Sequence, residues 1–294
     1  MRLGLHIVET GWRGGPPALG PLLREVVEAA EGAGFDVISV ADHVWLHPRM
    51  GGPLAGHLEA YTTLGYVAAH TRRARLMALA TAASYRHAGL LAKIVTTLDV
   101  LSGGRAMLGI GSGDYMEEAE GLGLPLPASI RERSEVLEET IQACLEMWDG
   151  ERGSGEAFEG EHVRLGRALN LPQSLGRPHP PILIAGSGER RTLPLVARYA
   201  DACNISPTPD LPRKLDVLRR LCDEVGRDYQ DIEKTAPYLF DVGEDGEKVP
   251  ELLDKLHWLA GLGIETVFGW VVGVDRLTPI EVMGRDVIPA VQEL

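Results

Sequence analysis

The chain has 294 residues, 45% of them hydrophobic, and a formal net charge of -13 at pH 7. This length and composition predict a globular protein with a full core, in either one large α/β domain or two small ones. The negative charge repels polyanions, so we expect neither nucleic acid nor an acidic membrane surface as a partner.

The sequence begins with MRLGLHIVETGWRGG, which lacks a basic segment followed by a long apolar one, and no later segment approaches about 18 uninterrupted apolar residues. We therefore expect no secretory signal and no membrane span, and a cytoplasmic location. Cys144, Cys203 and Cys222 lie far apart and form no C-x-x-C pair, which argues against a disulfide framework or a thiolate metal site. Each is predicted to be a small core residue.

Short apolar runs alternate with amphipathic helical stretches almost from end to end. Strands are predicted at 3–8, 35–41, 75–84, 105–111, 180–186, 201–207, 232–240 and 264–272. Helices are predicted at 22–34, 59–71, 89–104, 130–148, 192–200, 211–226, 249–263 and 279–293, with Gly34 ending the first.

The predicted strands are apolar throughout, which is typical of a parallel sheet covered on both faces. Eight strand-helix units in a chain of this size favour a closed (β/α)8 TIM-type barrel over an open doubly wound sheet. No linker divides the sequence, so we expect one barrel domain over residues 1–294. Within the irregular stretch 150–180, AFEGEHVRL predicts a small hairpin.

The carboxyl ends of parallel barrel strands form the mouth where chemistry takes place. Asp42 and His43 end the second strand, in VISVADHVW. Because the pKa of histidine lies near neutrality, a neighbouring carboxylate can tune His43 as a proton donor or acceptor. The alternative is a hydrogen-bonded histidine that only shapes the loop.

Two glycine-rich turns follow later strands. In LGIGSGDYMEE, the residues Gly111, Ser112 and Gly113 allow a ligand to approach the backbone, and Asp114 adds a titratable group. In AGSGERRTL, a helix begins after Gly186, Ser187 and Gly188 and carries Arg190 and Arg191, a pattern suited to holding a phosphate. Ordinary tight turns with solvated arginines are the alternative for both.

The third strand and its loop, ALATAASYRH, are rich in small side chains that leave room for a planar ring, with Thr81, Ser84, Arg86 and His87 at the mouth. His6 is interpreted as a structural core histidine, and Glu9 as a weaker candidate at the rim. No histidine or carboxylate cluster has convincing metal-ligand spacing, although His43, His47 and His57 share one loop region. We therefore predict no metal.

Three segments carry a resemblance to a known family: FDVISVADHVW, the stretch from HLEAYTTLGYVAAHT to LGIGSGDYMEE, and PPILIAGSGERRTLPLVARYADACNIS. They resemble the luciferase-like monooxygenase superfamily, and within it the oxidoreductases that use the deazaflavin coenzyme F420. The resemblance implies a TIM-type barrel with a flavin or deazaflavin ring at its mouth and hydride transfer to or from that ring.

The resemblance also implies roles for individual residues. His43 would be the acid/base or substrate-orienting group with Asp42 beside it, and Asp114 would be a catalytic carboxylate. A non-prolyl cis peptide is expected near Leu79 and Ala80. The implied cofactor-binding residues are Leu79, Ala80, Thr81, Gly111, Ser112, Gly113, Ala185, Gly186, Ser187, Gly188, Arg190 and Arg191.

This sequence departs from the family pattern at Ala88, where relatives have proline, and at Glu117, which replaces an amide. The leading hypothesis is an F420-dependent oxidoreductase acting on a small-molecule substrate. The rim loops that would select this substrate are expected at 45–58, 114–128, 241–248 and 271–278. The alternatives are an FMN-dependent monooxygenase, a flavin-binding barrel without turnover and, most distantly, a metal-dependent hydrolase. Relatives usually dimerise through barrel helices, so a homodimer is possible.

Overall fold

A computed structural model describes the chain except for residues 9–10, 150–154 and 177. Nine parallel strands form one sheet in the order β3-β2-β1-β11-β10-β9-β8-β5-β4. The strands are β1 (Arg2–Ile7), β2 (Val37–Val40), β3 (Arg75–Ala78), β4 (Thr81–Ala82), β5 (Leu108–Gly111), β8 (Ile182–Ala185), β9 (Ala202–Asn204), β10 (Glu233–Phe240) and β11 (Thr266–Val271).

The sheet closes on itself, as the sequence predicts. All eight predicted strands are present, and the ninth arises because the run 75–84 is divided into β3 and β4. The Leu79–Ala80 peptide bond between them is cis, as the family resemblance implies. A parallel bridge from Leu76 to Ala106 joins β3 to the segment entering β5. The predicted (β/α)8 barrel is therefore confirmed.

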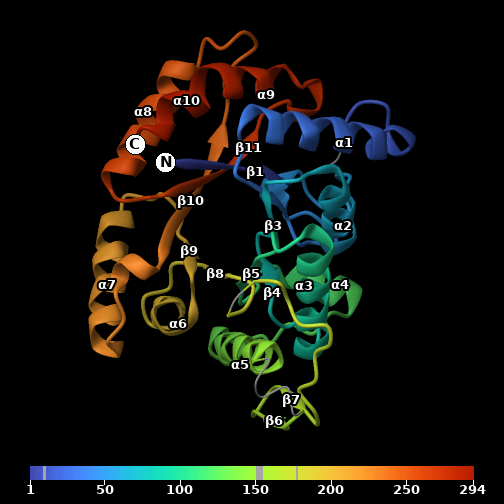
Figure 1. The fold of residues 1–294 in the computed structure, drawn as a ribbon, viewed down its shortest axis with the longest axis vertical. Helices are drawn as coiled ribbons and strands as arrows, with labels where there is room; N and C mark the ends of the chain where they lie inside the picture. The colour runs from blue at the N-terminus through green and yellow to red at the C-terminus, as the bar shows by residue number, and fades with distance from the viewer. Residues whose placement is uncertain (9–10, 150–154, 177) are drawn as a thin grey trace.

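Helices surround the strands (Figure 1). They are α1 (Pro16–Ala33), α2 (Ala60–His70), α3 (Ala88–Ser102), α4 (Met116–Leu122), α5 (Ile130–Trp148), α6 (Thr192–Tyr199), α7 (Leu211–Val225), α8 (Val249–Gly261), α9 (Thr278–Val282) and α10 (Ile288–Gln292). In α1, the residues Leu22, Val26 and Ala30 recur at helical spacing and are buried. Gly34 ends this helix in the left-handed region, at φ 103°, as predicted.

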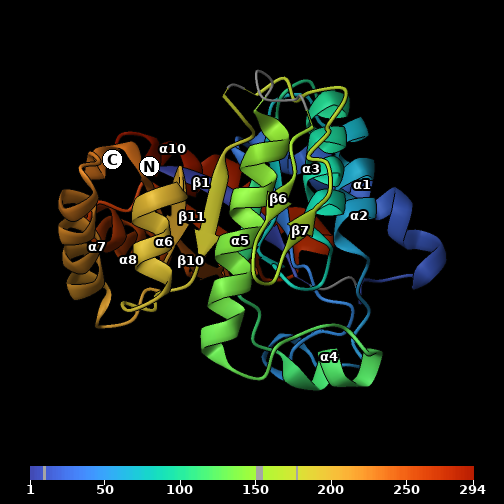
Figure 2. The ribbon, with the colours of Figure 1, turned by 90° about the horizontal axis from the view of Figure 1, so that it is seen from below.

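Three details refine the predicted elements. The hairpin of β6 (Phe158–Glu159) and β7 (Arg164–Leu165) is present and antiparallel. The predicted last helix is divided into α9, a π-helical turn over 283–287, and α10. Helix α4 lies within a segment that the sequence analysis treats as a loop, and it sits apart from the ring of barrel helices at one end of the barrel (Figure 2).

Two apolar clusters stabilise the barrel. The larger lies between strands and helices, and it includes the three cysteines, which are free and buried as predicted. The smaller lies on the opposite face of the strands, inside the barrel, and consists of Val37, Met77, Met107, Leu183, Ala202 and Phe268. Because this interior is filled with side chains, a ligand has to bind at the end of the barrel.

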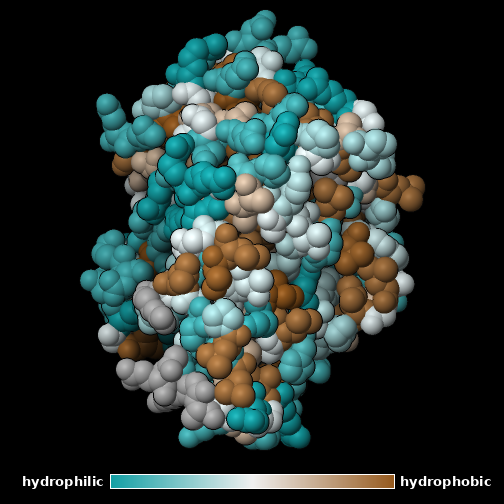
Figure 3. Space-filling view, turned by 45° about the vertical axis from the view of Figure 1, so that its right-hand side comes forward, coloured by the Kyte–Doolittle hydropathy of each residue, from teal (hydrophilic) through white to brown (hydrophobic). Residues whose placement is uncertain are grey.

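The surface carries scattered apolar side chains, and Figure 3 shows them as patches separated by hydrophilic residues. Leu90 and Leu101 of α3 are 55% and 73% exposed. That a second copy of the chain covers such residues stays a prediction. Among the described residues, no helix is long and apolar enough to cross a membrane.

Candidate active site

The carboxyl ends of the strands surround a cavity of about 350 Å³. Leu79, Ala80 and Ala185, which the sequence analysis assigns to the cofactor, line it. So do His6 of β1 and Asn204 of β9, which the sequence analysis does not assign to the site. The cavity therefore lies where the barrel architecture places binding sites.

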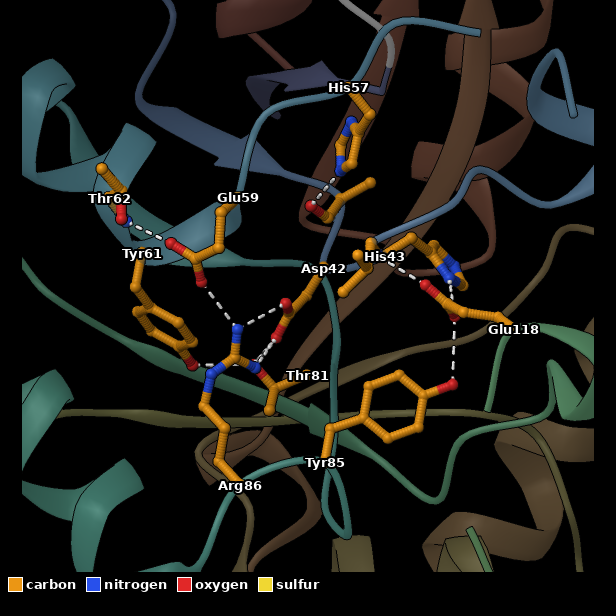
Figure 4. A network of polar contacts seen from close by, with 12 residues as sticks. Asp42, His43, His57, Glu59, Tyr61, Thr62, Thr81, Tyr85, Arg86 and Glu118 are labelled. Carbon is orange, nitrogen blue, oxygen red and sulfur yellow. Dashed lines mark hydrogen bonds and ion pairs between the residues drawn. The ribbon is translucent and has the colours of Figure 1, made fainter. Parts of the chain in front are cut away.

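Asp42 follows β2 and is held by a network of side chains (Figure 4). Its two carboxylate oxygens accept hydrogen bonds from the Arg86 guanidinium at 2.6 and 2.9 Å, and the hydroxyl of Thr81 donates a third at 2.7 Å. Arg86 also donates to Glu59 at 2.8 Å and lies 4.8 Å from the centre of the Tyr61 ring.

Bidentate arginine-carboxylate pairs are among the stronger protein hydrogen bonds. Burial lowers the pKa of Arg86, but its hydrogen bond to Asp42 and the charge of Asp42 outweigh burial, and the net pKa is raised. The guanidinium of Arg86 therefore stays charged. Because Arg86 and Thr81 occupy the carboxylate of Asp42, this geometry suits Asp42 to fixing the strand ends.

His43 makes a separate ion pair with Glu118 of α4 (Figure 4). Its Nδ1 lies 2.9 Å from Oε2 of Glu118, whose side chain is fully buried, while the imidazole keeps 20% of its surface exposed. The backbone N–H groups of Val44 and Trp45 donate to the other carboxylate oxygen, and the Tyr85 hydroxyl donates to Oε2 at 3.0 Å. One carboxylate thus joins α4 to the loops after β2 and β4.

The environment favours the charged form of both partners. Burial lowers the pKa of His43, but the hydrogen bond and the charge of Glu118 outweigh it, with smaller contributions from Asp114 and Asp42, so the net pKa is raised. Burial raises the pKa of Glu118, yet the hydrogen bonds from His43 and the backbone bring it below its usual range. Because Nδ1 is bound to Glu118, Nε2 is the ring nitrogen available to a ligand.

Asp114 follows the carboxyl end of β5, where its motif places it, but it makes no direct contact with His43. Its side chain is exposed and has no hydrogen-bond partner among the described residues, so it acts on His43 only through its charge. Glu118, four residues later, makes the direct contact. The catalytic role assigned to Asp114 stays a prediction. Glu118 was not among the residues predicted from the sequence.

His6 lies in the cavity wall rather than in the barrel core. Its Nδ1 is 3.0 Å from the Ser39 hydroxyl oxygen. Burial lowers its pKa to about 4, and the nearby His57 and His43 contribute to the decrease. His6 is therefore neutral near pH 7. The hydrogen bond to Ser39 agrees with the structural role predicted for His6. Its position in the cavity wall was not predicted.

The two glycine-rich loops adjoin at the mouth because β5 and β8 are paired. A Cβ added at Gly111 would lie 3.4 Å from the carbonyl oxygen of Ala185 and 4.0 Å from Cβ of Ala80. Gly113 and Gly186 have positive φ values of 73° and 129°, which other residues rarely adopt. Glycine at these positions therefore permits the turn conformations and the close packing of the two loops, and the predicted approach of a ligand to their backbone stays a prediction.

The loop before α6 has an excess of positive charge. Arg190 and Arg191 are exposed, and their side chains have no acidic partner among the described residues. Lys214 of α7 donates to the Ser187 hydroxyl at 3.0 Å. The described part of the chain offers no hydrogen-bond acceptor to the N–H groups of Ser187 and Gly188. Such donors and cations suit an anionic group.

Two further histidines of the loop after β2, His47 and His57, serve local structure. His57 lies 3.2 Å from the carbonyl oxygen of Ala41, and His47 accepts from the N–H of Arg49. Within the described residues, no group of three or more histidine, cysteine or acidic side chains is arranged to hold a metal ion. Glu9 lies outside the described residues.

Comparison with known proteins places this geometry in a family. The sequence model of the family described as luciferase-like monooxygenase matches residues 8–278. The chain belongs to the luciferase-like monooxygenase family. It is 30% identical over 262 residues to an F420-dependent glucose-6-phosphate dehydrogenase of Nakamurella multipartita, covering 86% of this chain and 73% of that protein.

Solved structures of other proteins share the fold of this luciferase-like protein. A coenzyme F420-dependent tetrahydromethanopterin reductase from Methanopyrus kandleri superposes with a TM-score of 0.79 at 18% identity, over 98% of each chain. A monooxygenase from Streptomyces bottropensis gives 0.80 at 19% identity, over 98% of this chain and 99% of that one. At these identities the likeness shows the fold alone.

The site of this luciferase-like protein thus has three parts beyond the carboxyl ends of the strands, the end at which the cavity also lies, although His43 and Asp42 do not line that cavity. The first is the ion pair of His43 with Glu118, the second is the network that holds Asp42, and the third is the pair of glycine-rich loops. Residues of all three parts were among those predicted from the sequence. The carboxylate that meets His43 lies on α4, and its only signal in the sequence is a short acidic segment before a glycine, which is too weak to identify it.

Proposed function

We propose that this luciferase-like protein is a coenzyme F420-dependent oxidoreductase that transfers a hydride between the deazaflavin ring and a small organic substrate. The observation that carries the proposal is the His43–Glu118 ion pair beyond the carboxyl end of β2, which supplies a titratable group of raised pKa. The F420-dependent relative of 30% identity supports the choice of cofactor.

The residues at the mouth fit such a cofactor. Leu79, Ala80 and Ala185 offer a small, apolar surface for a planar ring, and Gly111 packs closely beside Ala80 and Ala185. The loop from Gly186 to Arg191, with Lys214 behind it, presents donors and cations to an anionic tail. When bound, the deazaflavin supplies a two-electron hydride carrier.

The protein itself supplies orientation and a proton. Glu118 holds Nδ1 of His43, which fixes the direction of the ring and stabilises its protonated form. Nε2 can then donate a proton to a substrate oxygen in the reducing direction and accept one in the oxidising direction. The network of Asp42, Arg86 and Thr81 keeps the ends of β2 and β4 in a fixed arrangement.

A fluorescence-quenching titration of the purified protein with coenzyme F420, and in parallel with FMN, tests the proposal. Binding of F420 at micromolar concentration or below, with FMN at least about tenfold weaker, is the expected outcome. A preference for FMN would support the monooxygenase alternative and refute the assignment of the deazaflavin.

Turnover separates an enzyme from a binding protein. The loaded protein should oxidise reduced F420, or reduce F420, with at least one member of a panel of alcohols, carbonyl compounds and glucose 6-phosphate, followed by the absorbance of the oxidised cofactor. Tight binding of F420 without turnover on a wide panel would leave a deazaflavin-binding barrel instead.

A further inference from the structure

We infer that the substrate is an uncharged, largely apolar molecule with a hydroxyl or N–H group that donates a hydrogen bond into the cavity. That this molecule is a substrate rests on the proposed function. Its chemical class is inferred from the residues that line the cavity. One side of the cavity is apolar, its described lining residues carry no charge, and two of them present a hydrogen-bond acceptor that their own hydrogen bonds assign.

The apolar side of the cavity comes from β10 and β11. Tyr238 and Leu239 of β10, together with Phe268 and Trp270 of β11, line it. Aromatic side chains offer large flat contact areas that suit a ring or a branched hydrocarbon body. Among the described residues that line the cavity, none carries a charge near pH 7, since His6 is neutral.

The first acceptor is Nε2 of His6, and its protonation state follows from its neighbours. The hydroxyl of Ser39 donates to the carbonyl oxygen of Leu5, at 3.4 Å, so its oxygen accepts from Nδ1 of His6 at 3.0 Å. In a neutral imidazole with its proton on Nδ1, Nε2 carries a lone pair. That nitrogen has no partner among the described residues, and His6 lies in the cavity wall.

The second acceptor is the amide oxygen of Asn204, which is fixed by similar reasoning. The hydroxyl of Thr235 donates to the carbonyl oxygen of Cys203 at 2.7 Å, so its oxygen has to accept from the Asn204 amide NH₂ at 2.9 Å. This assigns the nitrogen of the amide to Thr235 and leaves its oxygen for the cavity, which Asn204 lines.

An anionic substrate is disfavoured by both local and long-range electrostatics. The two lone-pair acceptors repel an anion. The only side-chain donors on the aromatic side, the O–H of Tyr238 and the N–H of Trp270, are uncharged, so the described lining residues supply no paired charge against the cost of removing an anion from water. The formal net charge of -13 adds repulsion at a distance. The exposed cations Arg190 and Arg191 belong to the loop before α6, outside this wall.

Three probes of matched shape separate these requirements: 2-naphthol, 2-methoxynaphthalene and 2-naphthyl phosphate. The first is uncharged near pH 7 with one O–H donor, the second lacks the donor, and the third is an anion. Equilibrium dialysis against the F420-loaded protein should give the tightest binding for 2-naphthol. We expect 2-methoxynaphthalene to bind about fivefold more weakly and 2-naphthyl phosphate about a hundredfold more weakly.

A charge placed in the wall should reverse the preference. Leu239 lines the cavity and is 47% exposed, so Leu239→Lys is expected to be tolerated and to improve binding of 2-naphthyl phosphate by about tenfold. The matched control is Leu101→Lys on α3, where the leucine is 73% exposed and away from the cavity. The control should leave all three affinities unchanged.

The inference is overturned if wild-type protein binds 2-naphthyl phosphate as tightly as 2-naphthol, or if no probe binds in the millimolar range. Failure of the proposed function has a different signature, because F420 then fails to bind in its own titration. Repeating the dialysis without F420 shows whether the preference for 2-naphthol is a property of the cavity alone. If F420 binds and turns over only with glucose 6-phosphate, the function stands and the inference falls.

Discussion

The imidazole of His43 and the carboxylate of Glu118, 2.9 Å apart, set the chemistry at the scale of single residues. Glu118 raises the pKa of His43 against the effect of burial, so the protonated ring persists above its usual pH range. In Glu118→Gln this support is lost, and the pKa of His43 should fall. We therefore expect the pH profile of the reducing reaction to lose activity near pH 7 while keeping it at lower pH.

The measurement is an NMR titration of the His43 ring, read beside the pH profile. His43→Ala identifies the resonance and should lower turnover by about 10²- to 10⁴-fold while F420 affinity is retained. Tyr85→Phe removes a neutral hydrogen bond to Glu118 and serves as the control, with little change expected in the titration. An unchanged titration midpoint in Glu118→Gln would show that the ion pair does not tune His43.

At the scale of elements, α4 is held against the loop after β2 by close packing as well as by Glu118. A Cβ added at Gly121 would overlap the ring of Trp45, closer than carbon atoms approach in proteins. Gly121→Ala should therefore displace α4 and lower both turnover and the thermal unfolding midpoint, although alanine is the better helix former by about 1 kcal/mol. Tryptophan fluorescence reports the displacement, with Trp45→Phe used to identify the contribution of Trp45 among the five tryptophans.

The control for this substitution is Gly65→Ala in α2. Gly65 is exposed, and a Cβ there would meet nothing within 4 Å, so alanine should stabilise the protein by about 0.4–1 kcal/mol. Equal effects of the two substitutions on stability would mean that α4 is not packed against Trp45 in solution.

Periodicity explains which elements the sequence could predict. Long amphipathic helices and buried strands have strong patterns, so all eight barrel strands and the hairpin at 157–165 were predicted. Helix α4 has only seven residues and contains Gly121, so its pattern is weak, and tertiary contacts of Glu118 stabilise it instead. The predicted loop at 114–128 is wrong for that reason.

The same limit applies to the site. Strand ends can be located in the sequence, which is why His43 and Asp42 were found. Their partners could not be, because Glu118 is 75 residues from His43 and Arg86 is 44 residues from Asp42. Nor does the sequence tell that His6 faces a cavity, since a histidine within an apolar strand has the same pattern when it lies in a core.

At the scale of the whole molecule, the net charge of -13 opposes the approach of an anionic cofactor, while the loop carrying Arg190 and Arg191 attracts it locally. The Debye length falls from about 30 Å at 0.01 M salt to about 10 Å at 0.1 M, so salt screens the distant repulsion before the contact at the loop. The association rate of F420 in stopped flow should therefore rise over this range.

The variant with Arg190→Ala and Arg191→Ala should associate about tenfold more slowly in 0.1 M salt, since it loses the local attraction and keeps the repulsion. A wild-type rate that falls steadily with salt would mean that the cationic loop dominates the field at all distances, and that the net charge does not control access to the mouth.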